Sequence, residues 1–273
     1  GSSERCISCV INGEYGDTAV KATHQFFFHT AQTIEVFAFG AGTIGGTMID
    51  QIRDQREKLL KENVDIKVLA ITTIDGMNLC EDGLDLTNWR EDLKTPMFKF
   101  GPENVDDIIK FVKEKKPLNP VFVDCTASYD LPDRYLDILN AGMSIATPNK
   151  RANSKNIEFY HELRRVANKM HRRFLYETNV GAGLPIIDTL QNLYKSGDKL
   201  TSFNGIMSGS LSYIFGKLDE GVSFSKAVLE AKELRYTEPD PRDDLSGMDV
   251  ARKALIIARE SGYDIELEDI TMY

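Results

Sequence analysis

Charged side chains crowd one short stretch of the chain, the segment 236–253 with the sequence YTEPDPRDDLSGMDVARK. Two prolines exclude a regular helix in its first half, so the acidic residues beside them are expected on a stiff, extended loop. A helix is predicted to follow, with Ser246 as its N-cap and Asp249 reaching back to it. Asp249 and Lys253 then lie one turn apart on one helical face. Such a loop and charged pair suit a small polar substrate, and a capped surface helix with an ordinary salt bridge is the open alternative.

A glycine-rich turn near residue 40 joins a predicted strand to a predicted helix. The run Gly40-Ala41-Gly42-Thr43-Ile44-Gly45 directly follows the apolar segment IEVFAF. In this context Gly40 permits a tight turn, Gly42 allows the backbone to approach a pyrophosphate, and Gly45 allows close packing of the helix on the strand. The helix N-terminus presents free N–H groups and a positive dipole end to the phosphates. The run therefore predicts a dinucleotide site.

The end of the next predicted strand bears on which dinucleotide binds. An acidic residue at this position commonly holds the ribose of NAD. Thr72 and Thr73 stand there instead, with Asp75 beyond them. Because no carboxylate would repel a 2′-phosphate, NADP is favoured over NAD.

The hydrophobic pattern predicts an α/β protein built on a Rossmann-type doubly wound parallel sheet. Strands are predicted at 34–40, 66–73, 121–127 and 143–148, and helices at 43–62, 105–115 and 133–140. This nucleotide-binding domain is expected to span residues 34–178. Residues 179–273 are expected to form a partial α+β domain for catalysis and dimerisation, with a helix at 184–194, a strand at 200–207 and helices up to 262. Residues 1–33, with a strand at 7–11 and a helix at 17–29, are too few to bury a core and indicate a linker and the remnant of a preceding domain.

Composition argues against several kinds of partner. The 273 residues are 42% hydrophobic and 27% charged, as is typical of soluble globular proteins. A net charge of −9 argues against a nucleic-acid backbone as ligand. No apolar run is long enough to cross a membrane. Cys6 and Cys9 form a lone CxxC, which is a weak metal signal, and the sparse cysteines fit a reducing cytoplasm.

The segment 236–253 resembles, almost residue for residue, the substrate-binding motif of homoserine dehydrogenases, and the likeness covers nearly all of 34–270. The resemblance implies reversible reduction of L-aspartate 4-semialdehyde to L-homoserine by NAD(P)H, in threonine and methionine biosynthesis. It is strongest with the branch fused to aspartokinase, whose regulatory domain ends in a strand and helix similar to residues 1–33. It therefore implies covalently linked aspartokinase and regulatory domains. A homodimer is expected to form through the second domain, because its predicted sheet has too few strands to be stable alone.

The resemblance assigns roles to the charged residues. Lys253 would donate a proton to the nascent alkoxide. Asp249 and Glu238 would hold the ammonium and hydroxyl ends of the substrate, and Asp244 would support this polar network. Lys150, which ends the run TPNK after a strand, would face the cofactor and substrate and stabilise developing negative charge. A turn with a surface lysine is the alternative for Lys150.

Two further loops complete the implied site. Thr126 ends a predicted strand and would lie beside the nicotinamide, while a hydroxyl that merely caps the strand end is the alternative. Gly209 and Ser210 precede a predicted helix and would contact the substrate through backbone and hydroxyl.

The segment 177–185, ETNVGAGLP, offers one carboxylate and a glycine loop that exposes carbonyl groups. This all-oxygen set suits a hard cation rather than zinc. The resemblance implies a sodium or similar ion held by Glu177 and the carbonyl groups of Val180, Ala182 and Leu184. A purely structural turn is the alternative.

Two departures from the family pattern bear on function. Arg235 stands where many relatives have a glycine beside the cofactor, so its side chain would crowd the nicotinamide or reach a phosphate. The chain also ends at Tyr273, soon after the expected site, so this truncated chain is expected to fold but to be poorly active. The alternatives are a non-catalytic nucleotide-binding module for assembly of a larger enzyme, and another semialdehyde dehydrogenase with Cys125 as nucleophile. The acidic loop, which the second kind of enzyme does not need, argues against it.

Overall fold

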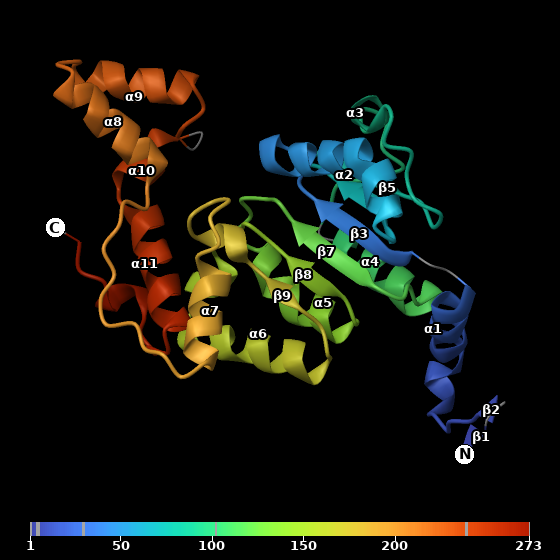
Figure 1. Cartoon of the computed structure of the whole chain (residues 1–273). Helices are drawn as coiled ribbons and strands as arrows, with labels where there is room; N and C mark the ends of the chain where they lie inside the picture. The colour runs from blue at the N-terminus through green and yellow to red at the C-terminus, as the bar shows by residue number, and fades with distance from the viewer. Residues whose placement is uncertain (1, 4–5, 29–30, 102, 238–239, 273) are drawn as a thin grey trace. The chain divides into compact units, whose positions relative to one another are not determined.

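The computed structural model describes residues 2–3, 6–28, 31–101, 103–237 and 240–272 (Figure 1). The chain divides into two compact units. Unit 1 comprises residues 1–127, 134–146 and 166–174, and unit 2 comprises residues 128–133, 147–165 and 175–273. The domain boundaries predicted at 33/34 and 178/179 stay predictions. Within the described ranges, no helix is both long enough and apolar enough to cross a bilayer.

A seven-stranded sheet in the order β6-β5-β4-β3-β7-β8-β9 lies at the centre of unit 1 (Figure 1). Parallel pairing joins the predicted strands, which the structure places at β3 (Gln32–Phe39), β4 (Val64–Thr72), β7 (Pro120–Asp124) and β8 (Ser144–Ala146). Their apolar runs are continuous because both faces of a parallel sheet are covered. The sequence did not predict the two edge strands, β6 (Phe98–Lys99) and β9 (Phe174–Leu175), or β5 (Gly76–Leu79), which lies between β6 and β4. Of these, β5 and β6 pair antiparallel.

Helices of unit 1 follow the predicted strands in the expected order. The helix α2 (Thr43–Lys61) begins directly after the glycine run and buries Ile49 in one apolar cluster with Val36 and Val68 of the sheet. This packing fixes the start of α2 beside the end of β3, where a dinucleotide site requires it. The other helices and 3-10 turns that lie wholly in unit 1 are η1 (Gly13–Tyr15), α1 (Gly16–Phe28), α3 (Trp89–Asp92), α4 (Glu103–Lys115) and α5 (Tyr135–Asn140).

Helices dominate unit 2, as the sequence predicted for the part of the chain from about residue 208 to residue 262. Its elements are η3 (Ala152–Ser154), η4 (Glu177–Asn179), α7 (Ile187–Lys195), α8 (Gly209–Asp219), α9 (Phe224–Glu233), α10 (Pro241–Leu245), α11 (Met248–Glu260) and η5 (Leu267–Asp269). The helix α6 (Ile157–Lys169) has residues in both units, as does the turn η2 (Leu131–Arg134). The helices α8 and α9 pack as a pair around Ile214, Ala227 and Ala231, which are fully buried (Figure 1).

Two predicted strands are wrong. Residues 198–208 form irregular chain, and most of the side chains from 201 to 206 are exposed. An apolar run becomes a strand only when a neighbour pairs with its backbone, and within the described part of unit 2 no ladder forms there. The strand predicted at 7–11 is reduced to the exposed pair Cys6–Ile7 of β2, which pairs with β1 (Ser2–Ser3).

The proline-containing loop is also organised differently from the prediction. Pro241 begins α10, because proline lacks the N–H that the first helical residue leaves unpaired. Asp240 is the N-cap of α10, and its carboxylate accepts from the N–H of Arg242 at 3.0 Å. Ser246 ends α10 instead of beginning α11, although its hydroxyl still accepts weakly from the N–H of Met248. The residue before α11 is Gly247, whose φ of +71° provides the sharp turn between the helices.

Candidate active site

The glycine run of unit 1 has the geometry that the sequence predicted. Gly40 has a φ of +85°, and its N–H donates to the carbonyl of Thr72 at 2.8 Å, which ties the turn to strand β4. A Cβ on Gly45 would lie 1.8 Å from the Gly40 carbonyl oxygen, so only glycine allows α2 to start this close to β3. A Cβ on Gly42 would meet nothing within 4 Å. The packing of the protein therefore leaves space before Gly42, where a ligand can approach the backbone.

The first turn of α2 supplies unpaired donors beside this space. The N–H groups of Thr43, Ile44 and Gly45 have no acceptor within the helix because they lie in its first turn. The next N–H, that of Gly46, donates to the carbonyl of Gly42 at 2.7 Å and starts the helical ladder. The free N–H groups and the helix dipole together suit a phosphate group.

Thr126 is held tightly at the end of β7. Its N–H and its hydroxyl both donate to one carboxylate oxygen of the fully buried Asp124, at 2.7 and 2.6 Å. The other oxygen accepts from the hydroxyl of Tyr135 at 2.6 Å. The structure thus shows the strand-capping role that the sequence left open, while a place for Thr126 beside a nicotinamide stays a prediction.

Cys125 precedes Thr126 and is a poor candidate for a nucleophile. Burial, with the neighbouring charge of Asp124, raises the pKa of its thiol to about 11. At neutral pH the thiol therefore stays protonated, whereas covalent catalysis requires the thiolate.

The end of β4 bears on the choice of dinucleotide. The hydroxyl of Thr72 is buried and, among the described residues, has no hydrogen-bond partner. Thr73 accepts from the N–H of Asp75 at 3.2 Å, and the side chain of Asp75 is exposed in the following turn. The preference for NADP stays a prediction.

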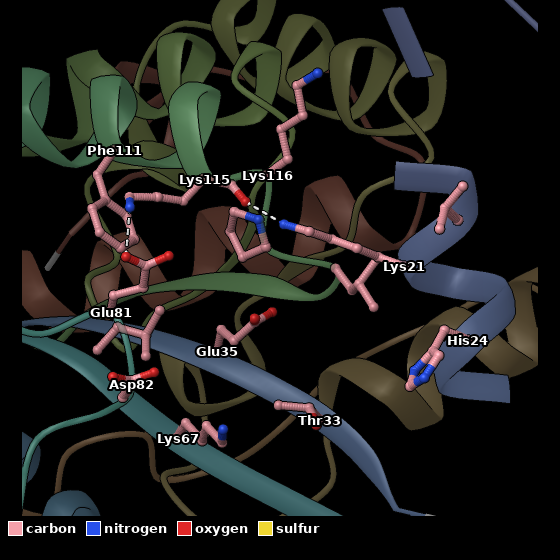
Figure 2. A pocket seen from close by; sticks show the side chains of 14 residues that line it. Lys21, His24, Thr33, Glu35, Lys67, Glu81, Asp82, Phe111, Lys115 and Lys116 are labelled. Atoms are coloured by element: carbon pink, nitrogen blue, oxygen red, sulfur yellow. Dashed lines mark hydrogen bonds and ion pairs between the residues drawn. The ribbon is translucent and has the colours of Figure 1, made fainter. Parts of the chain in front are cut away.

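Unit 1 also holds a cavity of about 480 Å³ beside α1 (Figure 2). Thr33 and Glu35, in the first half of β3, line it, whereas the glycine run follows the end of that strand. Several of its charged groups have protein partners. The ammonium of Lys115 lies 2.5 Å from Glu81, and that of Lys21 donates to the carbonyl of Lys115 at 2.8 Å (Figure 2). Glu35 accepts from the N–H of Asn119 at 3.0 Å. The Lys21 contact joins α1 to α4, and among the described lining residues no carboxylate is placed between two lysines as Asp249 is in unit 2.

Four charged residues predicted for the substrate site, Lys150, Asp244, Asp249 and Lys253, line one cavity of unit 2 with a volume of about 580 Å³. The cavity lining comes from four segments: the loop after β8, the start of α8, the α9–α10 connection with α10 itself, and α11. The lining residues are Lys150, Ser208, Gly209, Ser210, Tyr213, Arg235, Tyr236, Asp244, Asp249 and Lys253.

Asp249 lies between two lysines that also line this cavity. One carboxylate oxygen is 2.6 Å from the ammonium of Lys253, and the other is 3.2 Å from that of Lys150. Burial disfavours the charged carboxylate, but the two ammonium groups outweigh burial and lower the pKa of Asp249 below its usual value. Lys253 also donates to the carbonyl of Met207 at 2.7 Å. The ammonium of Lys253 is therefore held in a fixed direction, which a proton donor requires.

A hydroxyl network forms another part of the cavity lining. Ser210 donates to the carboxylate of Asp244 at 2.7 Å and contacts the hydroxyl of Ser208 at 3.0 Å. Ser208 is the N-cap of α8 and accepts from the N–H of Leu211. Gly209 has open space on its Cβ side, so the backbone here can approach a ligand. The prediction that placed Asp244 and Gly209-Ser210 in one site is consistent with this arrangement.

Some of the predictions concern residues away from this cavity. Glu238 lies outside the described residues. Glu177 accepts from the N–H groups of Ile187 and Asp188 at 2.9 and 2.8 Å, which anchors the start of α7. The carbonyl of Leu184 accepts from the N–H of Ile186. These contacts show the structural role of the 177–185 loop, and a sodium ion at Glu177 with the carbonyls of Val180, Ala182 and Leu184 stays a prediction.

Two aromatic residues of the cavity were missed. Tyr213 and Tyr236 line it, with their rings 5.0 Å apart in an edge-to-face arrangement. Tyr213 follows Ser210 by one helical turn, and this spacing was the available signal. Nothing in the local pattern indicated that the Met207 carbonyl would contact Lys253, because this contact depends on the irregular path of residues 198–208.

Known proteins match the chain over both units. A family model described as "Homoserine dehydrogenase, NAD binding domain" matches residues 40–177, and one described as "Homoserine dehydrogenase" matches residues 185–273. The bifunctional aspartokinase/homoserine dehydrogenase of Haemophilus influenzae is 49% identical over 270 residues, which are 99% of this chain and 33% of that protein. The homoserine dehydrogenase of Schizosaccharomyces pombe is 36% identical over 241 residues, 85% of this chain and 63% of that protein.

A solved structure has the same fold. A hyperthermophilic archaeal homoserine dehydrogenase in complex with NADPH aligns with a TM-score of 0.66 and 26% identity, over 84% of this chain and 70% of that one. The chain spans about a third of the length of bifunctional relatives such as the Haemophilus protein. Because the two family models together match residues 40–177 and 185–273, the chain belongs to the homoserine dehydrogenase family.

Proposed function

We propose that this chain is the dehydrogenase part of a bifunctional aspartokinase–homoserine dehydrogenase and that it reversibly reduces L-aspartate 4-semialdehyde to L-homoserine. The observation that carries the proposal is the triad of Lys150, Asp249 and Lys253 in the cavity of unit 2. A small polar aldehyde with an amino-acid end needs both signs of charge, and this cavity offers both. The bifunctional relatives support the covalent link to aspartokinase.

The nicotinamide of NAD(P)H supplies the hydride when the dinucleotide is bound. The glycine run and the first turn of α2 are the groups that would hold its pyrophosphate. The archaeal relative with NADPH supports a nicotinamide dinucleotide, and the missing carboxylate at Thr72-Thr73 favours NADP.

Lys253 is the proposed proton donor. When the substrate aldehyde is reduced, its oxygen would take a proton from the Lys253 ammonium. This leaves Lys253 as a neutral amine, which water then reprotonates. Asp249 forms an ion pair with the Lys253 ammonium, and the carbonyl of Met207 accepts a hydrogen bond from it and fixes its direction. Lys150 adds positive charge near the developing alkoxide. In homoserine oxidation the same amine accepts the proton.

Asp244 and Ser210 are proposed to orient the polar end of the substrate, together with the backbone at Gly209. Glu238 keeps its proposed part in substrate binding. Unit 2 is also the proposed dimerisation surface, where Phe215, Phe224 and Leu229 of α8 and α9 are exposed.

The test is an assay of the full-length protein with L-aspartate 4-semialdehyde and NADPH. We expect loss of NADPH absorbance that depends on the semialdehyde, with L-homoserine identified as product by mass spectrometry. L-glutamate 5-semialdehyde, which is longer by one methylene, is the matched control and should react much more slowly. Absence of NADPH oxidation in a folded protein that binds NADPH would favour the non-catalytic assembly module instead.

A further inference from the structure

Arg235 adopts a backbone conformation that favours glycine. Its φ is +58°, in the left-handed region that side chains rarely occupy. It follows the last turn of α9, where its N–H donates to the carbonyl of Lys232 at 3.0 Å and the N–H of Tyr236 donates to that of Ala231 at 2.9 Å. These two bonds form a Schellman helix end, whose left-handed position is usually glycine. The fold would therefore accept a glycine here more readily than an arginine.

The charge of Arg235 is not needed to end α9. A cation near a helix C-terminus stabilises the dipole, but Lys232 already lies in the last turn of α9. The side chain of Arg235 is exposed, and among the described residues it makes no ion pair or hydrogen bond. His171, after α6, also combines a non-glycine side chain with a positive φ at a helix end, so the case for Arg235 depends on its charge and on its place in the cavity.

Arg235 lines the proposed substrate cavity. Among the described cationic residues of this lining, it is the one without an ion pair to a carboxylate. Lys150 and Lys253 both contact Asp249. Asp244 accepts from Ser210. The two lysines are therefore engaged at the reacting end of the cavity, whereas the Arg235 guanidinium is available to an incoming anion.

We propose that Arg235 binds the α-carboxylate of the amino-acid substrate and so determines substrate specificity. This inference rests on the proposed function. An α-amino acid carries an ammonium group, which suits the carboxylates of Asp244 and Asp249 in the cavity lining, and a carboxylate, which needs a cation. A guanidinium can donate two parallel N–H bonds to a carboxylate, which gives orientation as well as charge. The phosphate of a dinucleotide has the same oxyanion chemistry and is the competing ligand that the experiment separates.

The experiment compares Arg235→Gly, Arg235→Gln and Arg235→Lys with wild type in the full-length protein. The readouts are KM and kcat for L-homoserine and for NADP⁺, and the melting temperature. Both uncharged variants should raise KM for homoserine roughly 10- to 100-fold, the range for one hydrogen bond to a charged group. The KM of Arg235→Lys for homoserine should lie between those of the uncharged variants and that of wild type. KM for NADP⁺ should change less than about twofold.

The melting temperature separates charge from backbone strain. Arg235→Gly should raise it by about 1–4 °C, because glycine relieves the left-handed strain, whereas Arg235→Gln should leave it unchanged. L-homoserinamide, which lacks the carboxylate charge, should give the same kcat/KM with wild type and Arg235→Gln. A rise in KM for NADP⁺ alone would assign Arg235 to the dinucleotide phosphate and overturn the carboxylate assignment. Unchanged KM values for both would also overturn it.

Failure of the proposed function can be told apart from failure of this inference. If wild type does not oxidise homoserine, binding of L-homoserine is followed by thermal shift in wild type and Arg235→Gln. Binding that is lost in the variant would support Arg235 as a carboxylate ligand despite the absence of turnover. Equal binding, or no binding to wild type, would reject it.

Discussion

The ammonium group of Lys253 lies 2.6 Å from the carboxylate of Asp249, one turn earlier on α11. Both side chains are partly buried, and the second oxygen of Asp249 faces Lys150. Charges at this distance interact more strongly where water is partly excluded than they do at a surface. The pair therefore holds the Lys253 side chain in the cavity where the proposed reaction needs a proton.

Replacement of Lys253 by alanine should lower kcat by roughly 10²- to 10⁴-fold, the usual range for a general acid–base group. KM should change much less, because the interaction is strongest as the alkoxide forms. Lys226→Ala, an exposed lysine of α9, is the matched control and should have wild-type kinetics. Steady-state assays of the full-length protein decide the matter. A raised KM with unchanged kcat would make Lys253 a substrate anchor.

Asp249→Asn should lower both activity and stability at neutral pH, because two lysines then face each other without a carboxylate between them. The pKa of Asp249 is lowered in the folded protein, so its stabilising effect is complete above the unfolded value of about 3.9. That effect is lost as the pH falls through the lower folded value. The difference in melting temperature between wild type and Asp249→Asn should therefore shrink on acidification below about pH 4. Glu233→Gln, an exposed acid of α9, is the control, and a difference independent of pH would contradict this account.

Gly42→Val should lower the affinity for NADPH, whereas Gly45→Ala should lower the stability of the fold. A side chain at position 42 enters open space, so the protein should keep its melting temperature but lose affinity for NADPH. A methyl group at position 45 collides with the Gly40 carbonyl and should lower the melting temperature. Titration of NADPH fluorescence and thermal unfolding measure the two effects. Equal NADPH affinity in wild type and Gly42→Val would remove the glycine run from the cofactor site.

The local parts of this molecule were predictable from the sequence. The start of α2, the strand β3 and the Asp249–Lys253 pair depend on spacing within a few residues, and such patterns determine local geometry. The contact between Lys150 and Asp249 joins positions far apart in the chain, so only the resemblance indicated it. The sequence analysis did not predict helix α10, because two prolines argue against a helix. Pro241, however, occupies the first helical position, where proline is favoured.

The sequence-based strand predictions failed in two situations. An apolar run had no neighbouring strand to pair with, or a strand was too short to show an alternating hydrophobic pattern. The run at 200–207 has the composition of a strand, but pairing depends on a neighbour that the described part of unit 2 does not place there. The strands β5 and β6 are only a few residues long, and antiparallel pairing at the sheet edge holds them in place. Sequence alone does not show such non-local pairing.

The last prediction concerns Glu260, at the other end of α11 from the cavity. It accepts hydrogen bonds from the hydroxyls of Tyr160 and Tyr176, each at 2.7 Å, and from Arg164 and Gln191, each at 2.8 Å. Burial raises the pKa of both tyrosines, so they stay protonated as donors. This network ties α11 to α6 and α7, within unit 2, and so supports the helix that carries Asp249 and Lys253.

Glu260→Gln removes the buried carboxylate that pairs with Arg164 and should destabilise the protein by about 3–5 kcal/mol, the usual penalty for breaking a buried ion pair on one side. The double variant Glu260→Met with Arg164→Met removes both charges and should recover much of that loss. Thermal unfolding of the single and double variants measures the coupling, and Glu268→Gln, an exposed acid of η5, is the control. If Glu260→Gln unfolds at the wild-type temperature, the network does not hold α11. In that case the position of Lys253 must depend on the Asp249 and Met207 contacts alone.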